Sequence, residues 1–393
     1  MVNSIISQND SDEMKVLHFV QTFSALSETF IYDLIIELEN QGTNNHVVTF
    51  RRVNESNRLF SKVSIISFSD RWAPERVARR IKAQILNYAP SYSFWPIQRK
   101  KLEDVVTQIK PDVIHSHFGP TGVIMQPICQ KYNIPHVVSF HGFDAFQLTK
   151  DFFWRKQYKS LISGETKITC VSKFMVNKLK EIFPERMLHI IHVGKNMNHY
   201  QFAEPVKKIE NWLSVGRLTH KKGHEDTIKA FSEIIEKYPN QKLKIIGEGE
   251  GRETLEILIE KSGIKQNIKL MGPLSHDEVK AEMDKSDAFI LSSKTAANGD
   301  MEGIPTVLME AQAMGKPCIS TLHSGIPEVF PPCSQSFLAK EGDIIDLANK
   351  IEMLLALSND QLKNIVQEGR QYVEKNFNLE IEVKKLRREY RTI

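Results

Sequence analysis

The sequence has few cysteines and no long hydrophobic run. Its four cysteines, Cys129, Cys170, Cys318 and Cys333, are far apart and form no C-x-x-C pair, which argues against a disulfide framework or a thiolate zinc site. No stretch approaches the roughly 18 uninterrupted apolar residues that a membrane-spanning helix needs. The polar start also lacks the basic-then-apolar order of a signal peptide. We therefore expect a cytoplasmic protein with reduced, mostly buried thiols.

A strong overall charge is also absent, because the net charge of the 393 residues is only +4. The charge is uneven, however, since residues 51–110 hold 13 Lys and Arg against 5 Asp and Glu. Aromatic residues lie among them, namely Trp72, Tyr88, Tyr92, Phe94 and Trp95. This pattern suits an anionic membrane surface or a lipid phosphate, although nucleic acid or a solvated helix face would also fit. We expect peripheral contact with the inner face of a membrane and no nucleic-acid partner.

The chain is too long for one core, since single cores stop growing near ~250–300 residues. Short apolar strands alternate with helical segments from KVLHFV (15–20) to LHIIHV (188–193), and again from NWLSVG (211–216) to QSFLA (335–339). Such alternation predicts parallel βαβ units. We expect an α/β protein with two Rossmann-like, doubly wound domains facing across a cleft, at residues 1–200 and 201–370. A helix at 371–393 is expected to pack back on the first domain.

Ligands of such sheets bind outside the carboxyl ends of the strands. The most informative loop there precedes a helix that starts near Pro305 and ends at Gly315. Gly303 lets the backbone approach a ligand closely. The free amides at the helix start belong to Ile304, Thr306 and Val307. Together they predict an anion site suited to a diphosphate.

Two carboxylates accompany this helix. Glu302 lies just before it and Glu310 lies within it, separated by seven residues. A carboxylate accepts from two neighbouring hydroxyls, so one group can hold a ribose diol and the other the hydroxyls of a sugar. An ordinary surface position is the alternative for Glu310, but the apolar residues around it favour a buried position with a hydrogen-bonding partner.

The E-x7-E spacing in EGIPTVLMEAQAMGKPCIST, followed by HSGIPE, resembles the signature of family-four retaining glycosyltransferases, which have the GT-B fold. The stretch NGDMEGIP is similar to bacterial exopolysaccharide transferases of the colanic acid and amylovoran type. The resemblance implies a hexosyltransferase that uses a UDP-sugar or GDP-sugar and retains the anomeric configuration. It implies a glycan or polyprenyl-diphosphate-linked acceptor and no cofactor beyond the donor.

Arg217 and Lys222 follow the strand NWLSVG. A guanidinium and an ammonium at a strand end can neutralise a diphosphate and stabilise it as a leaving group. Alone, an R-x4-K-G pattern is more often surface charge. The segment GRLTHKKG is similar to the family pattern, however, in which the equivalent pair contacts the donor diphosphate.

Two glycine-containing turns follow later strands. One holds Gly247, Glu248 and Gly249, and the other runs from Gly272 to Leu274. A simple strand-to-helix turn explains the glycines on their own. By resemblance, both turns lie around the nucleobase, and the backbone near Leu274 reads the base edge.

His141 directly follows an apolar strand, where a histidine can hydrogen-bond the reacting sugar. Its HGFD motif resembles a first-domain motif of the family whose histidine lies against the donor sugar. His115 and His117 share one face of another strand. We expect His117, close to Gly119, to contact the acceptor in the cleft, with hydrogen-bonded core histidines as the alternative.

No metal is needed to explain these histidines, and the only tidy D-x-D motif, Asp10-Ser-Asp12, lies in the polar N-terminal stretch. We therefore expect catalysis without a metal ion. The expected catalytic residues are His141, Glu302, Arg217 and Lys222.

The sequence departs from the family pattern in two places. Many members have paired glycines after the first strand, whereas here Ser27, Glu28 and Thr29 stand in that loop and are expected to line the acceptor site. At the linker, Gly194-Lys195-Asn196 replaces the common Gly-x-Asp. Two other functions remain open: a sugar-nucleotide epimerase of the same fold, and a catalytically silent protein that binds nucleotide sugars.

Overall fold

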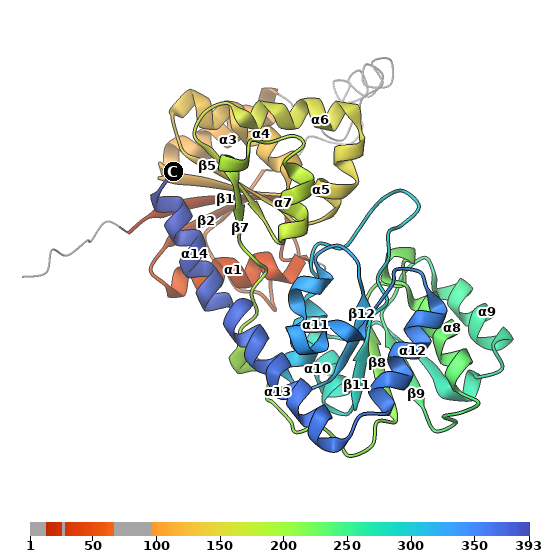
Figure 1. The fold of residues 1–393 in the computed structure, drawn as a ribbon. Coiled ribbons are helices and arrows are strands. Elements are labelled where there is room, and N and C mark those ends of the chain that lie inside the picture. Colours follow the sequence, from red (N-terminus) through yellow and green to blue (C-terminus); the bar gives the residue numbers. More distant parts are fainter. Residues whose placement is uncertain (1–12, 26–27, 67–95) are drawn as a thin grey trace, which may run out of the picture.

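The computed structural model describes residues 13–25, 28–66 and 96–393, which form two α/β domains (Figure 1). The first domain has a seven-stranded parallel sheet in the order β3-β2-β1-β4-β5-β6-β7, and the second a six-stranded parallel sheet in the order β10-β9-β8-β11-β12-β13. In both sheets the strand order reverses beside the first strand of the domain, as in doubly wound folds. The predicted pair of Rossmann-like domains is confirmed.

The strands of the first domain are β1 (Lys15–Phe23), β2 (Asn44–Arg52), β3 (Val63–Ile65), β4 (Val113–His117), β5 (His136–Phe140), β6 (Thr166–Cys170) and β7 (Leu188–Ile190). Its α-helices are α1 (Thr29–Asn40), α3 (Pro96–Ile109), α4 (Gly119–Tyr132), α5 (Phe143–Phe146), α6 (Phe152–Tyr158) and α7 (Lys173–Leu179). Strands β4 and β5 are buried at every position, because helices cover both faces of a parallel sheet.

The strands of the second domain are β8 (Asn211–Val215), β9 (Lys242–Ile246), β10 (Ile268–Gly272), β11 (Ala288–Ile290), β12 (Cys318–Thr321) and β13 (Leu338–Ala339). Its helices are α8 (His224–Ile234), α9 (Arg252–Lys261), α10 (His276–Asp284), α11 (Thr306–Ala313), α12 (Ile344–Leu355) and α13 (Asn359–Asn376). Among the described residues, no helix is both long and apolar enough to cross a bilayer.

The final helix, α14 (Leu379–Arg391), lies on the first domain rather than the second (Figure 1). Its apolar side chains Leu379, Val383, Leu386 and Tyr390 pack with residues of β1, α1, β4 and β5. The hydroxyl of Tyr390 also hydrogen-bonds the buried His115, at 2.6 Å. Helix α13, in contrast, packs on α11 of the second domain. The predicted boundary at residue 371 therefore falls inside α13, and the segment that packs on the first domain begins at Leu379.

The chain passes between the domains twice, and the two passages lie side by side. The amide of Lys195 donates to the carbonyl of Phe377 at 2.8 Å, and the amide of Leu379 donates to the carbonyl of Lys195 at 3.0 Å. A Cβ atom at Gly194 would overlap the backbone of Leu379, which accounts for a glycine there. The interdomain connection is thus a short two-stranded pairing.

Candidate functional site

A cleft of about 440 Å³ lies between the domains, at the carboxyl ends of the second sheet. Side chains from several elements that are distant in sequence line it. The predicted residues among them are Thr29, Arg217, Lys222, Leu274, Glu302, Pro305, Thr306, Val307 and Glu310. The two carboxylates and the two cations singled out in the sequence therefore face one cleft. Loops end up together in this way because all strands of a parallel sheet point in one direction.

Glu302 lies in the loop between β11 and α11 and is 8% exposed. Its Oε1 atom is 3.1 Å from Nζ of Lys222 and 3.9 Å from Nζ of Lys221. Burial alone would raise the pKa of the Glu302 carboxyl, but the two ammonium groups hold the pKa below its ordinary value. Hydrogen bonds also fix its backbone, through His323 on the amide and Ser324 on the carbonyl. Glu302 is therefore a fixed carboxylate.

The lysines that face Glu302 come from a single turn of 3-10 helix, His220–Lys222, between β8 and α8. Lys221 also pairs with Asp300, at 2.8 Å between Nζ and Oδ2. Gly223 ends the turn with a φ of +68°, and a Cβ atom there would overlap the carbonyl oxygen of Ser292. A glycine is needed here because few other residues tolerate this backbone conformation or this close approach.

Arg217 follows β8, is exposed, and forms no ion pair within 4.0 Å in the described parts of the chain. It lines both the main cleft and a neighbouring cavity of about 380 Å³. With Lys221 and Lys222 it makes a group of three cations beside the start of α11. The first-turn amides of Thr306 and Val307 have no acceptor within the helix. Cations and free amides together can bind an anionic group such as a diphosphate.

Three details of this helix start differ from the sequence prediction. Pro305 is the N-cap residue, and α11 begins one residue later, at Thr306. Gly303 does allow a close approach, but its neighbour is protein: a Cβ atom would overlap the carbonyl oxygen of His141 in the first domain. The glycine therefore lets the two domains meet. Ile304 lines the neighbouring cavity instead of the main cleft.

Glu310 lies on α11 and is 7% exposed. Its Oε1 atom is 2.8 Å from Nζ of Lys195, a residue of the interdomain passage that is itself 6% exposed. The predicted hydrogen-bonding partner of Glu310 is therefore a lysine. A carboxylate has lone pairs for about four hydrogen bonds, so this ion pair leaves capacity for a ligand.

His141 lines the neighbouring cavity, together with Glu28, Arg217, Asp300 and Thr306. Neither ring nitrogen of His141 has a hydrogen-bond partner among the described residues. Burial lowers the pKa of His141 to about 3, so the ring is neutral at physiological pH. The HGFD turn that carries His141 is held by a single carboxylate.

That carboxylate belongs to Asp144, which accepts hydrogen bonds from the amides of Gly119, His141 and Gly142 at 2.9 to 3.0 Å. Asp144 is fully buried. The HGFD aspartate therefore shapes the loop and ties it to the start of α4. It supports the position of His141 and does not line either cavity.

His117 and Gly119, which were expected to contact the acceptor, are buried in this arrangement of the domains and line neither cavity. His117 is 0% exposed and lies under His141, with ring centroids 6.0 Å apart and an interplanar angle of 16°. Gly119 is buried as well, and a Cβ atom there would collide with Phe140 and Tyr158. This burial and the contact with His18 agree with the alternative of a core histidine. Phe118, between the two, lines the cavity.

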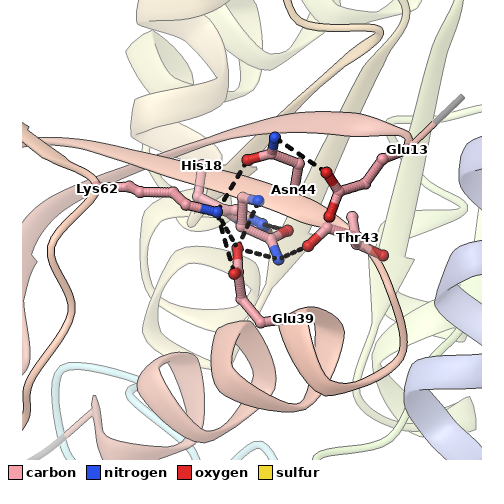
Figure 2. Close-up of polar contacts among 7 residues, drawn as sticks. Glu13, His18, Glu39, Thr43, Asn44 and Lys62 are labelled. Atoms are coloured by element: carbon pink, nitrogen blue, oxygen red, sulfur yellow. Dashed lines mark hydrogen bonds and ion pairs between the residues drawn. The ribbon is translucent and has the colours of Figure 1, made fainter.

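The buried histidines belong to a polar network in the first sheet. His18 contacts His117 through Nδ1 at 3.2 Å and Asn45 through Nε2 at 3.0 Å. Figure 2 shows how this network continues toward α1, where Glu39 binds Lys62 at 3.1 Å. The side chains in Figure 2 come from β1, α1, β2 and the segments that flank them, toward the amino ends of β1 and β2.

Three of these histidines, His18, His115 and His117, have ligand atoms within 4.8 Å of one another, as a metal site requires. The rings of His115 and His117 are stacked, however, with centroids 4.3 Å apart. Lone pairs lie in the ring planes, so stacked imidazoles do not converge well on one ion. Both nitrogens of His18 and of His115 already have polar neighbours, which are Tyr390 and Ser139 in the case of His115.

Of the two turns expected around a nucleobase, only the one with Leu274 reaches the lining of the main cleft. Leu274 lines the main cleft, beside Ser275 and His276 at the start of α10. Gly247 and Gly249 instead pack behind the loop that carries Arg217, since Cβ atoms there would overlap the carbonyl oxygens of Gly216 and Leu218. Two further predicted residues lie outside the cleft lining: Glu248 is exposed and pairs with Arg252 at 3.0 Å, and Gly272 ends β10.

Part of the predicted acceptor side lies outside the described residues. This applies to Ser27 and to residues 67–95 with most of the basic and aromatic region. The Asp10-Ser-Asp12 motif also lies outside the described residues. The neighbours of Ser27 are described: Glu28 lines the smaller cavity and Thr29 the main cleft.

Three Lys and Arg residues that line the main cleft were not predicted from the sequence: Lys195, Lys221 and Arg58. Lys221 is adjacent to the predicted Lys222 and could have been suggested by the paired lysines. Arg58 comes from the loop after β2, and Lys195 from a linker without periodicity. The sequence contains no signal for these two, because Arg58 lies in a loop without a motif and the ion-pair partner of Lys195, Glu310, belongs to the other domain.

Comparison with known proteins gives consistent matches. The model of the group 1 glycosyl transferases matches residues 199–372, and that of glycosyltransferase family 4 matches residues 27–198. A putative colanic acid biosynthesis glycosyltransferase of Escherichia coli K12, WcaL, is 28% identical over 94% of this chain and 97% of its own length. The amylovoran biosynthesis glycosyltransferase AmsK of Erwinia amylovora is 28% identical over 95% and 98%. An uncharacterized glycosyltransferase of Methanocaldococcus jannaschii is 30% identical over 71% and 75%.

Solved structures share the two-domain fold across nearly the whole chain. Sucrose-phosphate synthase from Thermosynechococcus elongatus superposes with a TM-score of 0.76 at 17% identity, covering 97% of this chain and 99% of that one. Anabaena HepE in complex with UDP and glucose has a TM-score of 0.75 at 15% identity, covering 97% and 100%. The likeness establishes the GT-B fold.

Proposed function

We propose that this chain, which belongs to the glycosyltransferases of group 1 and family 4, moves a sugar from a nucleotide diphosphate sugar to a glycan or lipid-linked oligosaccharide acceptor, with retention of configuration. The product would enter a surface polysaccharide. The proposal for this role is supported by relatives whose names refer to colanic acid and amylovoran biosynthesis and which match over almost their full length.

One observation carries the proposal: Glu302, Glu310, Arg217 and Lys222 converge on one cleft at the start of α11. A donor diphosphate fits the cations and the free amides of the helix. One carboxylate is available for the ribose and the other for the sugar. HepE, which has the same fold, was solved with UDP and with UDP-glucose, and this supports a nucleotide sugar as the ligand here.

The charges of the cleft suggest a mechanism for bond breakage. As the glycosidic bond of the donor breaks, negative charge develops on the departing phosphate, where Arg217 and Lys222 can stabilise it. The acceptor hydroxyl attacks from the same face, and the departing phosphate oxygen takes its proton. Neutral His141 can hydrogen-bond the reacting sugar from the first domain. No metal ion is required in this scheme, because the two cations supply the positive charge.

The acceptor is proposed to occupy the smaller cavity, between the domains. It is lined by Glu28 and by the aromatic rings of Phe30, Phe118 and Phe143. Aromatic rings beside a carboxylate suit a sugar, which has apolar faces and many hydroxyl groups. We also propose that the basic and aromatic region at residues 51–110 holds the protein against an anionic, inner membrane surface, where a polyprenyl-diphosphate-linked acceptor would be found.

A donor screen tests the proposed function. UDP-sugars and GDP-sugars are assayed with a lipid-linked acceptor panel, and the anomeric configuration of the product is read by NMR spectroscopy. We expect transfer with retention, unaffected by EDTA. Substitutions R217A and E302Q should each lower kcat/KM by about 10²–10³-fold, since each removes a charged contact in the transition state. The control K167Q removes an ion pair of similar length, 2.9 Å, far from the cleft and should be fully active.

The outcomes separate this proposal from its alternatives. A product of inverted configuration would contradict retention. Isomerisation of the donor in the absence of an acceptor would identify an epimerase. Donor binding with no transfer to any acceptor would favour a silent binding protein. Full activity of both R217A and E302Q would remove the cleft from the mechanism.

A further inference from the structure

Lys195 occupies an unusual position, because it belongs to both the interdomain passage and the cleft. Its backbone pairs with the returning segment through Phe377 and Leu379, at 2.8 and 3.0 Å. Its side chain reaches Glu310 on α11, at 2.8 Å. A single residue therefore links the connection between the domains to a carboxylate of the site.

The surroundings make Glu310 dependent on this lysine. Asp33 of α1 and the hydroxyl of Tyr200 lie near the ion pair, and each adds to the electrostatic field at Lys195. Burial by itself would lower the pKa of Lys195, but the attraction to Glu310 outweighs it and raises the pKa above its ordinary value. Loss of the ammonium would leave a carboxylate that is 7% exposed without its countercharge, so the Glu310 side chain would no longer be held in its present orientation.

We propose that Lys195 is a positioning residue for the donor nucleotide: its ammonium, 2.8 Å from Glu310, orients that carboxylate so that it can accept hydrogen bonds from both ribose hydroxyls. The inference rests on the proposed function, because it assumes that a nucleotide binds in this cleft. It assigns the diol to Glu310, which lines the main cleft and keeps lone pairs for a ligand beside its ion pair with Lys195.

A purely structural role for Lys195 is the competing explanation. Buried ion pairs often contribute little net stability, and apolar residues of similar volume can replace them. A lysine kept only for packing would affect every ligand of the cleft equally, or none. A lysine that orients Glu310 affects only ligands that carry the diol. The two explanations therefore differ in a measurable way.

The experiment measures dissociation constants by isothermal titration calorimetry for UDP and GDP and for their 2′,3′-dideoxy analogues. For the nucleotide that the wild-type protein binds, K195Q should raise the dissociation constant about tenfold, the size of a lost charged hydrogen bond. With the dideoxy analogue the change should be under about twofold. E310Q should give the same pattern, and the double variant K195Q/E310Q should be no worse than either single variant.

Controls and opposing outcomes complete the test. K195R keeps the charge but moves it, and should show a loss of about threefold that is again confined to nucleotides with the diol; it also serves if K195Q does not fold. K167Q should bind both kinds of nucleotide as the wild type does. An equal loss with both kinds, no loss, or tighter binding by K195Q would overturn the positioning role. A wild-type protein that binds neither UDP nor GDP would instead contradict the proposed function.

Discussion

Single side chains of the first domain are held in charge states that burial dictates. Burial lowers the pKa of His18 to about 4 and that of His136 to about 3, and it also depresses the pKa values of His115 and His117. Each is 0% exposed and lies in a hydrogen-bonded position that suits a neutral imidazole. The folded protein therefore cannot take up protons at these sites as readily as the unfolded chain can.

This difference predicts a fall in stability on mild acidification. Above pH 6.5 both states are neutral at these histidines, so they add no pH dependence. Below pH 6.5 the unfolded chain binds protons that the folded protein excludes until about pH 4, and each such histidine lowers the free energy of unfolding by up to about 1.4 kcal/mol per pH unit. Urea denaturation at pH 7.5, 6.5 and 5.5 measures the effect.

The variant H136Q tests whether the buried histidines cause this pH dependence of the free energy of unfolding. H136Q keeps a polar side chain between Ser116 and Gln126 but cannot titrate. Unfolding of H136Q should therefore take up about one proton less than unfolding of the wild type, and its free energy of unfolding should fall less steeply as the pH is lowered. His192 works in the opposite direction, because Glu328 and Glu382 raise its pKa despite its burial. An unchanged free energy of unfolding between pH 7.5 and 5.5 would contradict the assignment of neutral buried histidines.

At the scale of elements, the turn before α8 places the lysines that face Glu302. Gly223 ends this turn with a φ of +68° against the carbonyl oxygen of Ser292. We expect G223A to destabilise the protein by about 3 kcal/mol, because it adds both backbone strain and a steric overlap. G263A is the control: Gly263 has a similar φ of +74° but open space around it, so only about 1 kcal/mol should be lost.

Thermal unfolding and donor affinity together check this prediction. G223A should also weaken donor binding, since a shift of the turn moves Lys222 away from Glu302. G263A should leave donor binding unchanged. Equal destabilisation by the two substitutions would show that the contact with Ser292 is unimportant.

The strands and helices could largely be predicted, because each depends on a short stretch of sequence. Alternating apolar strands and helices are encoded in short stretches, so both sheets follow from the sequence. The convergence of Arg217, Glu302 and Glu310 also follows, because parallel strands place their carboxyl ends at one edge. The burial of His117, in contrast, could not be predicted from the sequence. Its position on β4 fixes which face it shares with His115, but not that the ring of His141 covers it.

At the scale of the whole molecule, the features that could not be predicted from the sequence are contacts between segments that are far apart in the chain. Lys195 meets Glu310 across 115 positions of the chain, and His115 meets Tyr390 across 275. No local pattern in the sequence predicts either contact. The same is true of Gly303, whose need for a glycine comes from the first domain.

Helix α14 offers a test of long-range dependence. Removal of residues 379–393 uncovers the apolar face formed with Val16, Leu38 and Val137, and buried apolar side chains contribute about 1.5–3 kcal/mol each. We expect the first domain to unfold at a lower temperature while the second keeps its own transition, as measured by calorimetry. Removal of Thr392 and Ile393 alone should cost little. A single unchanged transition after the long truncation would refute this dependence.

Because α14 belongs to the first domain, the domain that is synthesised first is not the first that can finish folding. The ribosome makes the sheet of that domain early, yet the helix that covers β1 and β4 is translated after every strand of the other domain. The second domain can therefore finish folding while the first still has an uncovered apolar surface. For the newly made chain, translation of the last helix is the step that ends its exposure to aggregation.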